Sequence, residues 1–590
     1  MKERIDNNIA KFWNKKSNLI FWQKNPKKIF RFNKKNLNYE WFYDGKTNIC
    51  YNCLDRNVKE GLKNKVAIHT IKENGEIDSY TYYELLKLVD NFSEFLVKNF
   101  KGKLKKVMIH SSASIESSIS MLACMRLGVT HNVIFEDLEL DAIEVRAKLF
   151  KPDLFISRSQ VKINNLKERC KNLKFLLLNK EIKKDKKNLQ FNISKITKSN
   201  YVIKTRCKFL NSINESFVLF TSGSTGLPKG VVHTTGGYLV FAKYSCLENF
   251  GMNKNSVVFT ASDAGWINGH TYALYGPLSI GATTILIEKP TSILDENILK
   301  KIILNLKPSI MYLPVTLIRI LKSLDFKLAK SSYLKTLGSM GEPLAPEVAK
   351  WFAAFCGLKN KTIVNTYFQT ETGGIITAPK FNDKLSNTPF GTVGKPEKIF
   401  KLSLKKIDKS NKSEIIIENP WPGCMINVVN ERKVWKKYWN KKYHFRLFDS
   451  GSFDKFGNLI IHGRTDDVIN IRGHRIGSAE IEAILLKNKI AVEVCAVATD
   501  DFLEGSVLNI FLVISKGEKK IDHIIKKDLI SNFGSFALPK KIVYLDELPK
   551  TKSGKILRRL LRDLLEKKEK LGDLSTLINK GIVENIKKKI

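Results

Sequence analysis

Long apolar runs are missing from this sequence of 590 residues. Its longest apolar stretches, such as residues 507–514, have the length of a single strand, whereas a membrane-spanning helix needs about 20 apolar residues. The basic N-terminal segment also lacks the apolar core of a secretory signal peptide. These absences argue against membrane insertion and secretion, and we expect a soluble protein in the cytoplasm.

Cysteine is scarce and follows no regular spacing. The nine cysteines include a single C-x-x-C pair, Cys50 and Cys53, without the second pair that a structural zinc site requires. A redox pair is one interpretation, but two ordinary buried thiols are favoured, because free cysteine is among the most buried residue types. Such low, unpatterned use is typical of a reducing compartment.

Acidic residues are also few, with 58 Asp and Glu against 100 Lys and Arg and a formal net charge of +42. This charge suggests a surface that binds nucleic acid or an anionic membrane. Arginine, whose planar fork reads phosphates and bases, accounts for only 17 of the basic residues. The 83 lysines are scattered, and together with abundant Asn and Ile they fit AT-rich codon usage. Composition alone leaves both interpretations open.

What is present is a globular composition, 43% apolar and 27% charged, whose pattern predicts an α/β fold. Short β-rich runs alternate with helical patterns from residue 66 to residue 337, as in substantially parallel sheets. A further β-rich block covers 391–462. We predict an N-terminal extension (1–40), a large domain (41–465) and a small C-terminal domain (466–590), whose lysine-rich last 25 residues are expected to fray.

The most informative segment is the glycine-rich stretch FTSGSTGLPKG at residues 220–230, which follows an apolar strand directly. Glycines let the backbone wrap closely around a ligand, and exposed N–H groups then form a nest for an anion. Hydroxyl groups and Lys229 add donors suited to phosphate oxygens. The stretch is not a Walker A loop, because Pro228 and Gly230 stand where that motif needs glycine and a hydroxyl residue. A flexible surface turn is the weaker alternative.

Two polar segments further along the chain contain candidate carboxylates. The stretch NTYFQTETGG at 365–374 holds Glu371, which is either a ligand for Mg²⁺ beside phosphates or a solvated loop residue. Asp449 precedes the stretch GRTDDVINIRGHRI at 463–476. A carboxylate can accept both hydroxyls of a ribose, and Arg464 can pair with phosphate, although caps and surface charges are the alternative.

The last candidate segment is LPKTKSGKILRR at residues 548–559. A small polar turn at Gly554 places Lys555 at the opening of an amphipathic helix. A lone lysine in such a place is usually a solvated charge, so this segment supports a functional interpretation only together with the other three.

Together and in this order, the four segments resemble the adenylate-forming superfamily, and most closely its AMP-forming acetyl-CoA and propionyl-CoA synthetase family. Supporting stretches lie at 41–58, 230–240, 263–288 and 337–347, and the resemblance runs from Trp41 to Arg562. It implies a large N-terminal adenylation domain with β-sheets flanked by helices, followed by a small mobile α+β C-terminal domain. It also implies an acid–thiol ligase that uses ATP, Mg²⁺ and coenzyme A and forms acyl-CoA, AMP and pyrophosphate through an acyl-adenylate.

The resemblance gives each matching position a role. Lys555 matches the catalytic lysine that neutralises charge as pyrophosphate leaves, Glu371 matches the Mg²⁺ ligand, and Arg464 is expected to approach phosphate or ribose. Asp466 matches the hinge about which the small domain rotates between the two half-reactions. The positions matching nucleotide-binding or CoA-binding residues are Thr221, Ser222, Gly223, Ser224, Thr225, Gly226, Lys229, Gly341, Glu342, Pro343, Asn365, Thr366, Tyr367, Phe368, Gln369, Thr370, Asp449, Arg464 and Arg475.

The implied acyl pocket departs from the family pattern. Phe368 stands where acetate-specific members have a tryptophan, which opens one wall, and Asn268 adds a polar group. A methylene is worth only about 1–3 kcal/mol of discrimination, so acetate and propionate are both expected substrates. A small acid with a polar substituent, such as 3-hydroxypropionate, is the alternative. The pocket positions are Trp266, Ile267, Asn268, Met340 and Phe368.

Other interpretations make different predictions. A nucleic-acid-binding protein would show clustered arginine or aromatic residues and steep salt dependence. A degenerate, nonenzymatic relative would lack Glu371, Asp449, Arg464 or Lys555, yet all four are present. Transfer of the acyl group to a carrier protein is not favoured by the short-chain synthetase stretches. The family also suggests regulation by a lysine acetyltransferase and deacetylase acting on Lys555, and Ile530 stands where a CoA-contacting arginine is expected.

Overall fold

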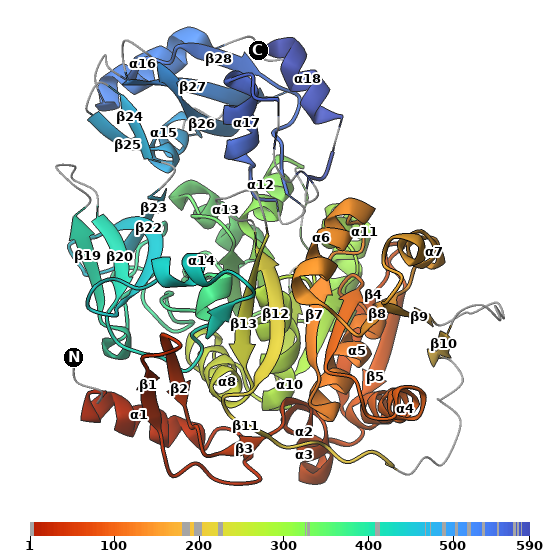
Figure 1. The fold of residues 1–590 in the computed structure, drawn as a ribbon. Coiled ribbons are helices and arrows are strands. Elements are labelled where there is room, and N and C mark those ends of the chain that lie inside the picture. The colour runs from red at the N-terminus through yellow and green to blue at the C-terminus, as the bar shows by residue number, and fades with distance from the viewer. Residues whose placement is uncertain are drawn as a thin grey trace.

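The computed structural model describes most of the chain, beginning at residue 5. The residues left undescribed are 1–4, 180–188, 194–202, 222–227, 325, 327, 329–330, 407–412, 466–467, 472–473, 487–490, 502–504, 516–520, 534–536, 552–553, 570, 572–573, 575–576 and 580. Two regions stand out in Figure 1: a large lower region that contains most of the strands, and a smaller upper region formed by the last quarter of the chain.

Two large sheets form the lower region. The first has six mutually parallel strands and ends in two antiparallel ones. In spatial order its strands are β10 (Leu189–Asn192), β9 (Lys174–Asn179), β8 (Leu154–Ser157), β6 (Lys106–His110), β7 (Thr130–Ile134), β12 (Glu215–Thr221), β13 (Lys229–Thr234) and β21 (Asn427–Val428). Their apolar, β-branched sequences suit strands buried on both faces.

The second sheet is parallel except for its last pair of strands, β4 and β5. In spatial order its strands are β18 (Ile363–Asn365), β17 (Thr336–Met340), β16 (Ile310–Pro314), β14 (Val257–Thr260), β15 (Thr283–Ile287), β4 (Val66–Ile71) and β5 (Ile77–Thr81). The alternation of strands and helices predicted between residues 66 and 337 therefore builds two sheets.

Helices cover both faces of each sheet. One core cluster joins the two sheets through α4 (Tyr82–Phe100), α5 (Ile115–Leu127), α8 (Gly236–Phe250) and α10 (Gly276–Ile280). The other face of the first sheet packs against α6 (Leu140–Phe150) and α7 (Gln160–Arg169). The other face of the second sheet packs against α11 (Glu296–Lys301), α12 (Val315–Ser323) and α13 (Pro346–Phe355). The α/β prediction is confirmed.

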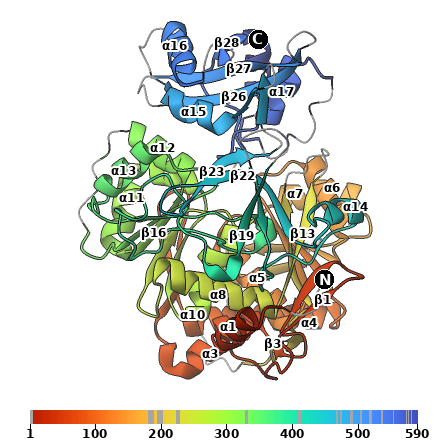
Figure 2. The ribbon, with the colours of Figure 1, turned by 90° about the vertical axis from the view of Figure 1, so that its left-hand side faces the viewer.

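A smaller antiparallel sheet lies between these layers and the upper region (Figure 2). Its strands are β19 (Leu402–Lys406), β20 (Ser413–Ile417), β22 (Phe445–Phe453) and β23 (Leu459–Arg464). The short helix α14 (Arg432–Lys437) precedes β22. Because β23 is the last strand before the upper region, this sheet carries the connection between the two regions.

The upper region is a small α+β unit. Its strands are β24 (Val468–Ile471), β25 (His474–Gly477), β26 (Ala491–Asp501), β27 (Gly505–Ile514) and β28 (Lys541–Tyr544). Its helices α15 (Ser478–Leu485) and α16 (Asp522–Phe533) share one apolar cluster with β26 and β27, while α17 (Arg558–Leu565) and α18 (Ile582–Lys589) share another. Strands of one sheet thus separate two helical layers.

Both ends of the chain are folded more tightly than their composition suggests. At the N-terminus, α1 (Asn7–Ser17) buries Trp13 in the main core beside the hairpin of β1 (Phe30–Asn33) and β2 (Asn38–Trp41). The expectation that the last 25 residues fray is wrong for α18, because Ile582, Val583 and Ile586 are buried in the C-terminal core. The apolar stripe outweighs the lysines on the opposite face.

The hydropathy of the helices agrees with the lack of long apolar runs in the sequence. Within the described part of the chain, no helix combines the length and the apolar character that crossing a bilayer requires.

Candidate active site

The glycine-rich stretch joins two paired strands. Thr221, the last residue of β12, and Lys229, the first residue of β13, are register partners, so the antiparallel pair brings the two ends of the stretch together. Residues Ser222, Gly223, Ser224, Thr225 and Gly226 lie outside the described residues. The buried Thr221 hydroxyl has no partner among the described atoms. A hydroxyl at this position is available to a ligand, because buried polar groups are rarely left unpaired.

Lys229 and Glu371 are joined by a tyrosine. The Nζ of Lys229 donates to the hydroxyl of Tyr438, 2.9 Å away, and that hydroxyl donates to Oε1 of Glu371 over 2.7 Å. The Nζ of Lys229 also lies 3.7 Å from Oε1 of Glu371. A lysine at the end of the glycine-rich stretch and a buried carboxylate are therefore held next to each other, which suits a polyphosphate that binds together with a cation.

A buried histidine fixes the backbone that carries Glu371. The Nε2 of His233, on β13, lies 2.7 Å from the carbonyl oxygen of Thr370. Since a carbonyl only accepts, this nitrogen carries the proton and donates. Burial lowers the pKa of His233 to about 4, so the ring is neutral at physiological pH and acts as a fixed hydrogen-bond donor.

Asp449 is the centre of a second polar group. Its Oδ2 accepts from the hydroxyl of Tyr367 at 2.7 Å and from Nε2 of Gln369 at 2.6 Å. Arg464 is the register partner of Asp449 across β22 and β23. The candidate ribose-binding carboxylate is thus aligned by two residues of the 365–374 segment and lies opposite the candidate phosphate-binding arginine on the neighbouring strand.

The remaining nucleotide candidates lie at the carboxyl ends of β17 and β18. Thr366 donates through its hydroxyl to the carbonyl oxygen of Ser339 at 2.7 Å, and Asn365 donates to the carbonyl oxygen of Thr392 at 2.9 Å. Gly341 follows β17 directly with φ of +91°. Ligands of parallel α/β sheets bind at the carboxyl ends of the strands, so these positions are where a nucleotide is expected.

Glu342 and Pro343 contact α12 rather than another loop. Nη1 of Arg319, on α12, lies 2.7 Å from Oε2 of Glu342, and Nη2 of Arg319 lies 3.5 Å from the carbonyl oxygen of Pro343. No sequence motif marks Arg319, which has the pattern of an ordinary helix residue. The ion pair fixes the segment that follows Gly341 against the first turns of α12.

The candidate acyl-pocket residues share a region of unpaired polar atoms. The short helix α9 (Ile267–His270) follows Trp266, whose buried Nε1 has no partner among the described atoms. Both amide atoms of Asn268 are likewise buried without a partner in the part of the chain that the structure describes. Met340 and Phe368 belong to a neighbouring apolar cluster, in which Phe368 packs against Tyr272 with ring centroids 5.6 Å apart.

The turn that carries Lys555 contacts the lower region. Thr316, at the start of α12, donates through its hydroxyl to the carbonyl oxygen of Gly554 over 3.2 Å. Lys555 is exposed and its N–H donates to the hydroxyl of Thr551. The predicted helix begins later than expected, at Arg558, and before it the Thr551 N–H donates to the Lys555 carbonyl oxygen.

Three further predicted residues also lack a described side chain. Asp466, the candidate hinge, lies outside the described residues, two positions after Arg464, which ends β23. Arg475 lies on β25 opposite Asn470, and Arg464 ends β23. The structure therefore places the backbone of both arginines, whereas Ile530 on α16 is exposed.

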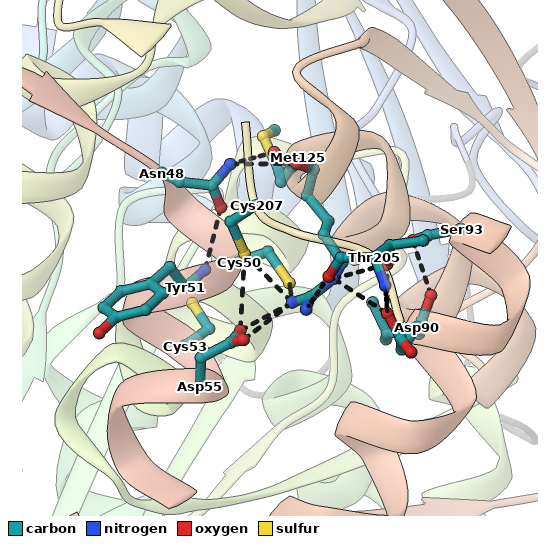
Figure 3. Close-up of polar contacts among 12 residues, drawn as sticks. Asn48, Cys50, Tyr51, Cys53, Asp55, Asp90, Ser93, Met125, Thr205 and Cys207 are labelled. Carbon is teal, nitrogen blue, oxygen red and sulfur yellow. Dashed lines mark hydrogen bonds and ion pairs between the residues drawn. The ribbon is translucent and has the colours of Figure 1, made fainter. Parts of the chain in front are cut away.

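Another polar cluster was not predicted (Figure 3). The ligand atoms of Cys50, Asp55 and Cys207 lie within 4.8 Å of one another. Nη1 of Arg126 lies 2.8 Å from Oδ2 of Asp55, 3.1 Å from Sγ of Cys207 and 3.9 Å from Sγ of Cys50. The fixed positive charge of Arg126 takes the place that a metal cation would need, so the cluster is an ion-pair network.

This network holds the segment that leads into β12. Nη2 of Arg126 donates to the carbonyl oxygen of Thr205 at 2.6 Å, and Nε lies 3.5 Å from Oδ1 of the buried Asp90. The Cys50 thiol lies beside Cys207, whereas Cys53 contacts the carbonyl oxygen of Tyr275. The thiols of Cys50 and Cys53 therefore have different partners, although both residues belong to one C-x-x-C motif.

Comparison with known proteins places the chain among enzymes. Family models match in order: the acetyl-coenzyme A synthetase N-terminus at residues 1–53, the AMP-binding enzyme at 54–423 and the AMP-binding enzyme C-terminal domain at 480–555. The chloroplastic/glyoxysomal acetyl-coenzyme A synthetase of Arabidopsis thaliana is 32% identical over 99% of this chain and 84% of that protein. The acetyl-coenzyme A synthetase of Leptospira biflexa is 33% identical over 99% of this chain and 94% of that protein.

A solved structure has the same fold. The acetoacetyl-CoA synthetase of Streptomyces lividans superimposes with a TM-score of 0.84 at 16% identity, covering 99% of this chain and 92% of that one. At this identity the likeness concerns the arrangement of the chain, including the small C-terminal unit.

Proposed function

The chain belongs to the acetyl-coenzyme A synthetase family of AMP-binding enzymes, and from this membership we infer that it ligates a short carboxylic acid to coenzyme A. The enzyme is an AMP-forming acid–CoA ligase: acid, ATP and CoA give acyl-CoA, AMP and pyrophosphate. The observation that carries this conclusion is the match to acetyl-coenzyme A synthetases over 99% of the chain. A polar-substituted acid such as 3-hydroxypropionate is not favoured by these relatives.

In the first half-reaction we propose that the 221–229 stretch and Lys229 hold the terminal phosphates of ATP. Asp449, aligned by Tyr367 and Gln369, accepts the ribose hydroxyls. The acid's carboxylate then attacks the α-phosphorus, and Lys555 neutralises the charge that develops as pyrophosphate leaves. Because no covalent intermediate with the enzyme is needed, positioning of these groups accounts for catalysis.

The residues also fit a magnesium ion. Glu371 offers a buried carboxylate beside Lys229, and Thr221 adds a hydroxyl that lacks a described partner. Hard oxygen ligands of this kind are those that Mg²⁺ prefers. When bound, the ion supplies charge neutralisation for the phosphates; Glu371 holds it, and His233 holds the backbone of Thr370 beside Glu371.

In the second half-reaction the CoA thiol displaces AMP. We propose that residues 466–590 form the mobile domain, with Asp466 as the hinge, residues 41–465 as the adenylation domain and residues 1–40 as an extension packed onto it. Arg475 then contacts CoA. The exposed position of Lys555 supports a further proposal, namely that a lysine acetyltransferase and deacetylase act on it in the cytoplasm.

ATP–pyrophosphate exchange tests the function directly. Exchange is measured with acetate, propionate, butyrate, acrylate and 3-hydroxypropionate in turn, and acyl-CoA and AMP are then quantified after CoA is added. We expect exchange with acetate and propionate and equal amounts of acyl-CoA and AMP. Absence of exchange with every small carboxylate would overturn the proposal.

A further inference from the structure

Two buried histidines meet behind the candidate acyl pocket. His131 lies on β7 and His270 on α9, and neither side chain is exposed. Their Nε2 atoms are 3.3 Å apart. The ring planes differ by 7° and the centroids are 5.4 Å apart, so the rings meet largely edge to edge. This is the geometry of an N–H···N hydrogen bond.

The contacts determine which nitrogens carry protons. Nδ1 of His270 lies 3.1 Å from the carbonyl oxygen of Trp266, and a carbonyl only accepts, so Nδ1 carries the proton. Burial lowers the pKa of His270 to about 3 and that of His131 well below its ordinary value, so both rings are neutral. A neutral ring has one N–H, so Nε2 of His270 is the acceptor and Nε2 of His131 is the donor.

The other contacts of His131 agree with this assignment. Its Nδ1, which is then the bare nitrogen, has no partner among the described atoms. A lone pair without a partner is tolerated more readily than a buried N–H without one. The hydroxyl of Tyr275 lies 3.3 Å from Nε2 of His131 and can share its proton.

Strand β7 holds Trp266 from two sides. Its His131 acts on the Trp266 carbonyl through His270. Phe135, the residue that follows β7, packs against the indole ring of Trp266 with centroids 5.0 Å apart. Both the backbone and the ring of Trp266 are therefore positioned from one strand of the first sheet.

The same short segment also contains buried polar atoms that lack partners among the described residues. Trp266 Nε1 and both amide atoms of Asn268 are buried and unpaired within the described part of the chain. Three such atoms within three residues are unusual, because buried polar groups normally find a partner. These atoms are available to a ligand or to water, while His270 holds the carbonyl oxygen of Trp266 at the N-terminal end of α9.

We propose that His131 is a positioning residue for the acyl pocket: through His270 it fixes the Trp266–Asn268 wall against which the short carboxylic acid binds. This inference rests on the proposed function. His131 lies outside every motif of the sequence, and its described polar contacts are with His270 and Tyr275. Its effect on catalysis passes through the orientation of His270.

Paired variants separate positioning from packing. His131→Met removes the N–H while keeping a long side chain, and His131→Gln retains an N–H near the place of Nε2. We expect His131→Met to raise KM for the carboxylate about fivefold to tenfold with KM for ATP unchanged, and His131→Gln to restore most of the loss. Equal losses in both variants, or parallel changes in the two KM values, would overturn the proposal.

A neighbouring histidine provides the matched control. His110 is fully buried on the adjacent strand β6, where its Nδ1 lies 2.9 Å from the Ser157 hydroxyl. His110→Met is expected to lower thermal stability as much as His131→Met does, without a selective change in the carboxylate KM. The same KM change in the control would mean that general loosening, rather than the His131–His270 bond, is responsible.

The protonation pattern is measured independently of activity. Nitrogen-15 NMR of histidine-labelled enzyme should assign the proton of His270 to Nδ1 and that of His131 to Nε2, and His131→Met should perturb the His270 signals. The reverse assignment in the parent enzyme would overturn the relay. If the parent enzyme shows this pattern but activates no carboxylate, the proposed function fails while the hydrogen-bonded pair stands.

Discussion

The hydroxyl of Thr316 donates to the carbonyl oxygen of Gly554, 3.2 Å away, and so joins α12 to the turn that carries Lys555. A Cβ atom on Gly554 would lie 2.5 Å from Oγ1 and 2.7 Å from Cβ of Thr316. The turn therefore approaches the large domain as closely as a glycine allows, and this contact holds the lysine-bearing turn against the large domain.

Gly554→Ala should slow adenylation. The added methyl group collides with Thr316, and φ of +80° is unfavourable for alanine. We expect ATP–pyrophosphate exchange to fall at least about tenfold, while formation of acyl-CoA from supplied acyl-adenylate changes much less. Gly457→Ala is the control, because Gly457 has φ of +82° but nothing within 4 Å of the added atom. Equal losses in both half-reactions would contradict the assignment of this contact to adenylation.

Tyr438→Phe should weaken binding of ATP. The variant removes the hydroxyl that lies between Lys229 and Glu371 and leaves the buried carboxylate with one hydrogen bond fewer. KM for ATP is expected to rise about threefold to tenfold, with KM for the carboxylate unchanged. Tyr333→Phe, at an exposed tyrosine, serves as the control. If the variant instead changed only KM for the carboxylate, Tyr438 would act on carboxylate binding rather than on ATP binding, and this assignment would be wrong.

Phe368→Trp should shift preference towards acetate. Phe368 packs against Tyr272 and belongs to the same cluster as Met340, so a larger ring at 368 reduces the space for the acyl chain. The ratio of kcat/KM for acetate over propionate is expected to rise about tenfold, since one methylene is worth about 1–3 kcal/mol. An unchanged ratio would show that Phe368 does not line the acyl pocket.

The buried histidines should make the enzyme sensitive to acid. Burial lowers the pKa of His233 from 6.5 to about 4, so the unfolded state binds its proton first as pH falls. Its stabilising contribution is complete above pH 6.5, decreases as the pH falls towards 4, and is lost below that. Thermal midpoints between pH 7 and pH 4 should decline less steeply in His233→Gln; identical slopes would rule out this histidine as a cause.

Removal of Arg126 should destabilise the large domain. Arg126→Met leaves Asp55 and the fully buried Asp90 without their common cation, and breaking a buried pair costs about 3–5 kcal/mol. Urea unfolding measures the loss. Arg169→Met removes an arginine that pairs with Asp141 on the surface, and no measurable change is expected there. Equal stability of Arg126→Met and the parent would show that the network is dispensable.

Local signals in the sequence predicted the elements well where a motif or a cap defines them. Helix α5 is an example, because Ser114 forms a capping box at its start and Gly128 takes a left-handed conformation at its end. The glycine-rich stretch, Glu371 and Asp449 were recognised because each lies within a short, characteristic segment. Their mutual placement in the fold follows from sheet order.

Contacts between distant segments could not be predicted in this way. Tyr438 lies in a lysine-rich stretch without a motif, yet its hydroxyl links Lys229 to Glu371. Nothing in the spacing of Cys50 and Cys207 indicates that they share Arg126. The frayed end expected from composition is wrong for the same reason: the partners of α18 are residues far away along the chain.

The pairing of Asp449 with Arg464 has a mechanical consequence. If Asp466 is the pivot, the axis of rotation passes only two residues from the strand position that faces the ribose-binding carboxylate. Points close to a pivot move little, whereas Lys555 lies far along the chain from residue 466, on the turn that contacts Thr316 of α12. Under the proposed function, a rotation at this hinge would therefore move Lys555 relative to the adenylate while the contact between Asp449 and the ribose barely changes.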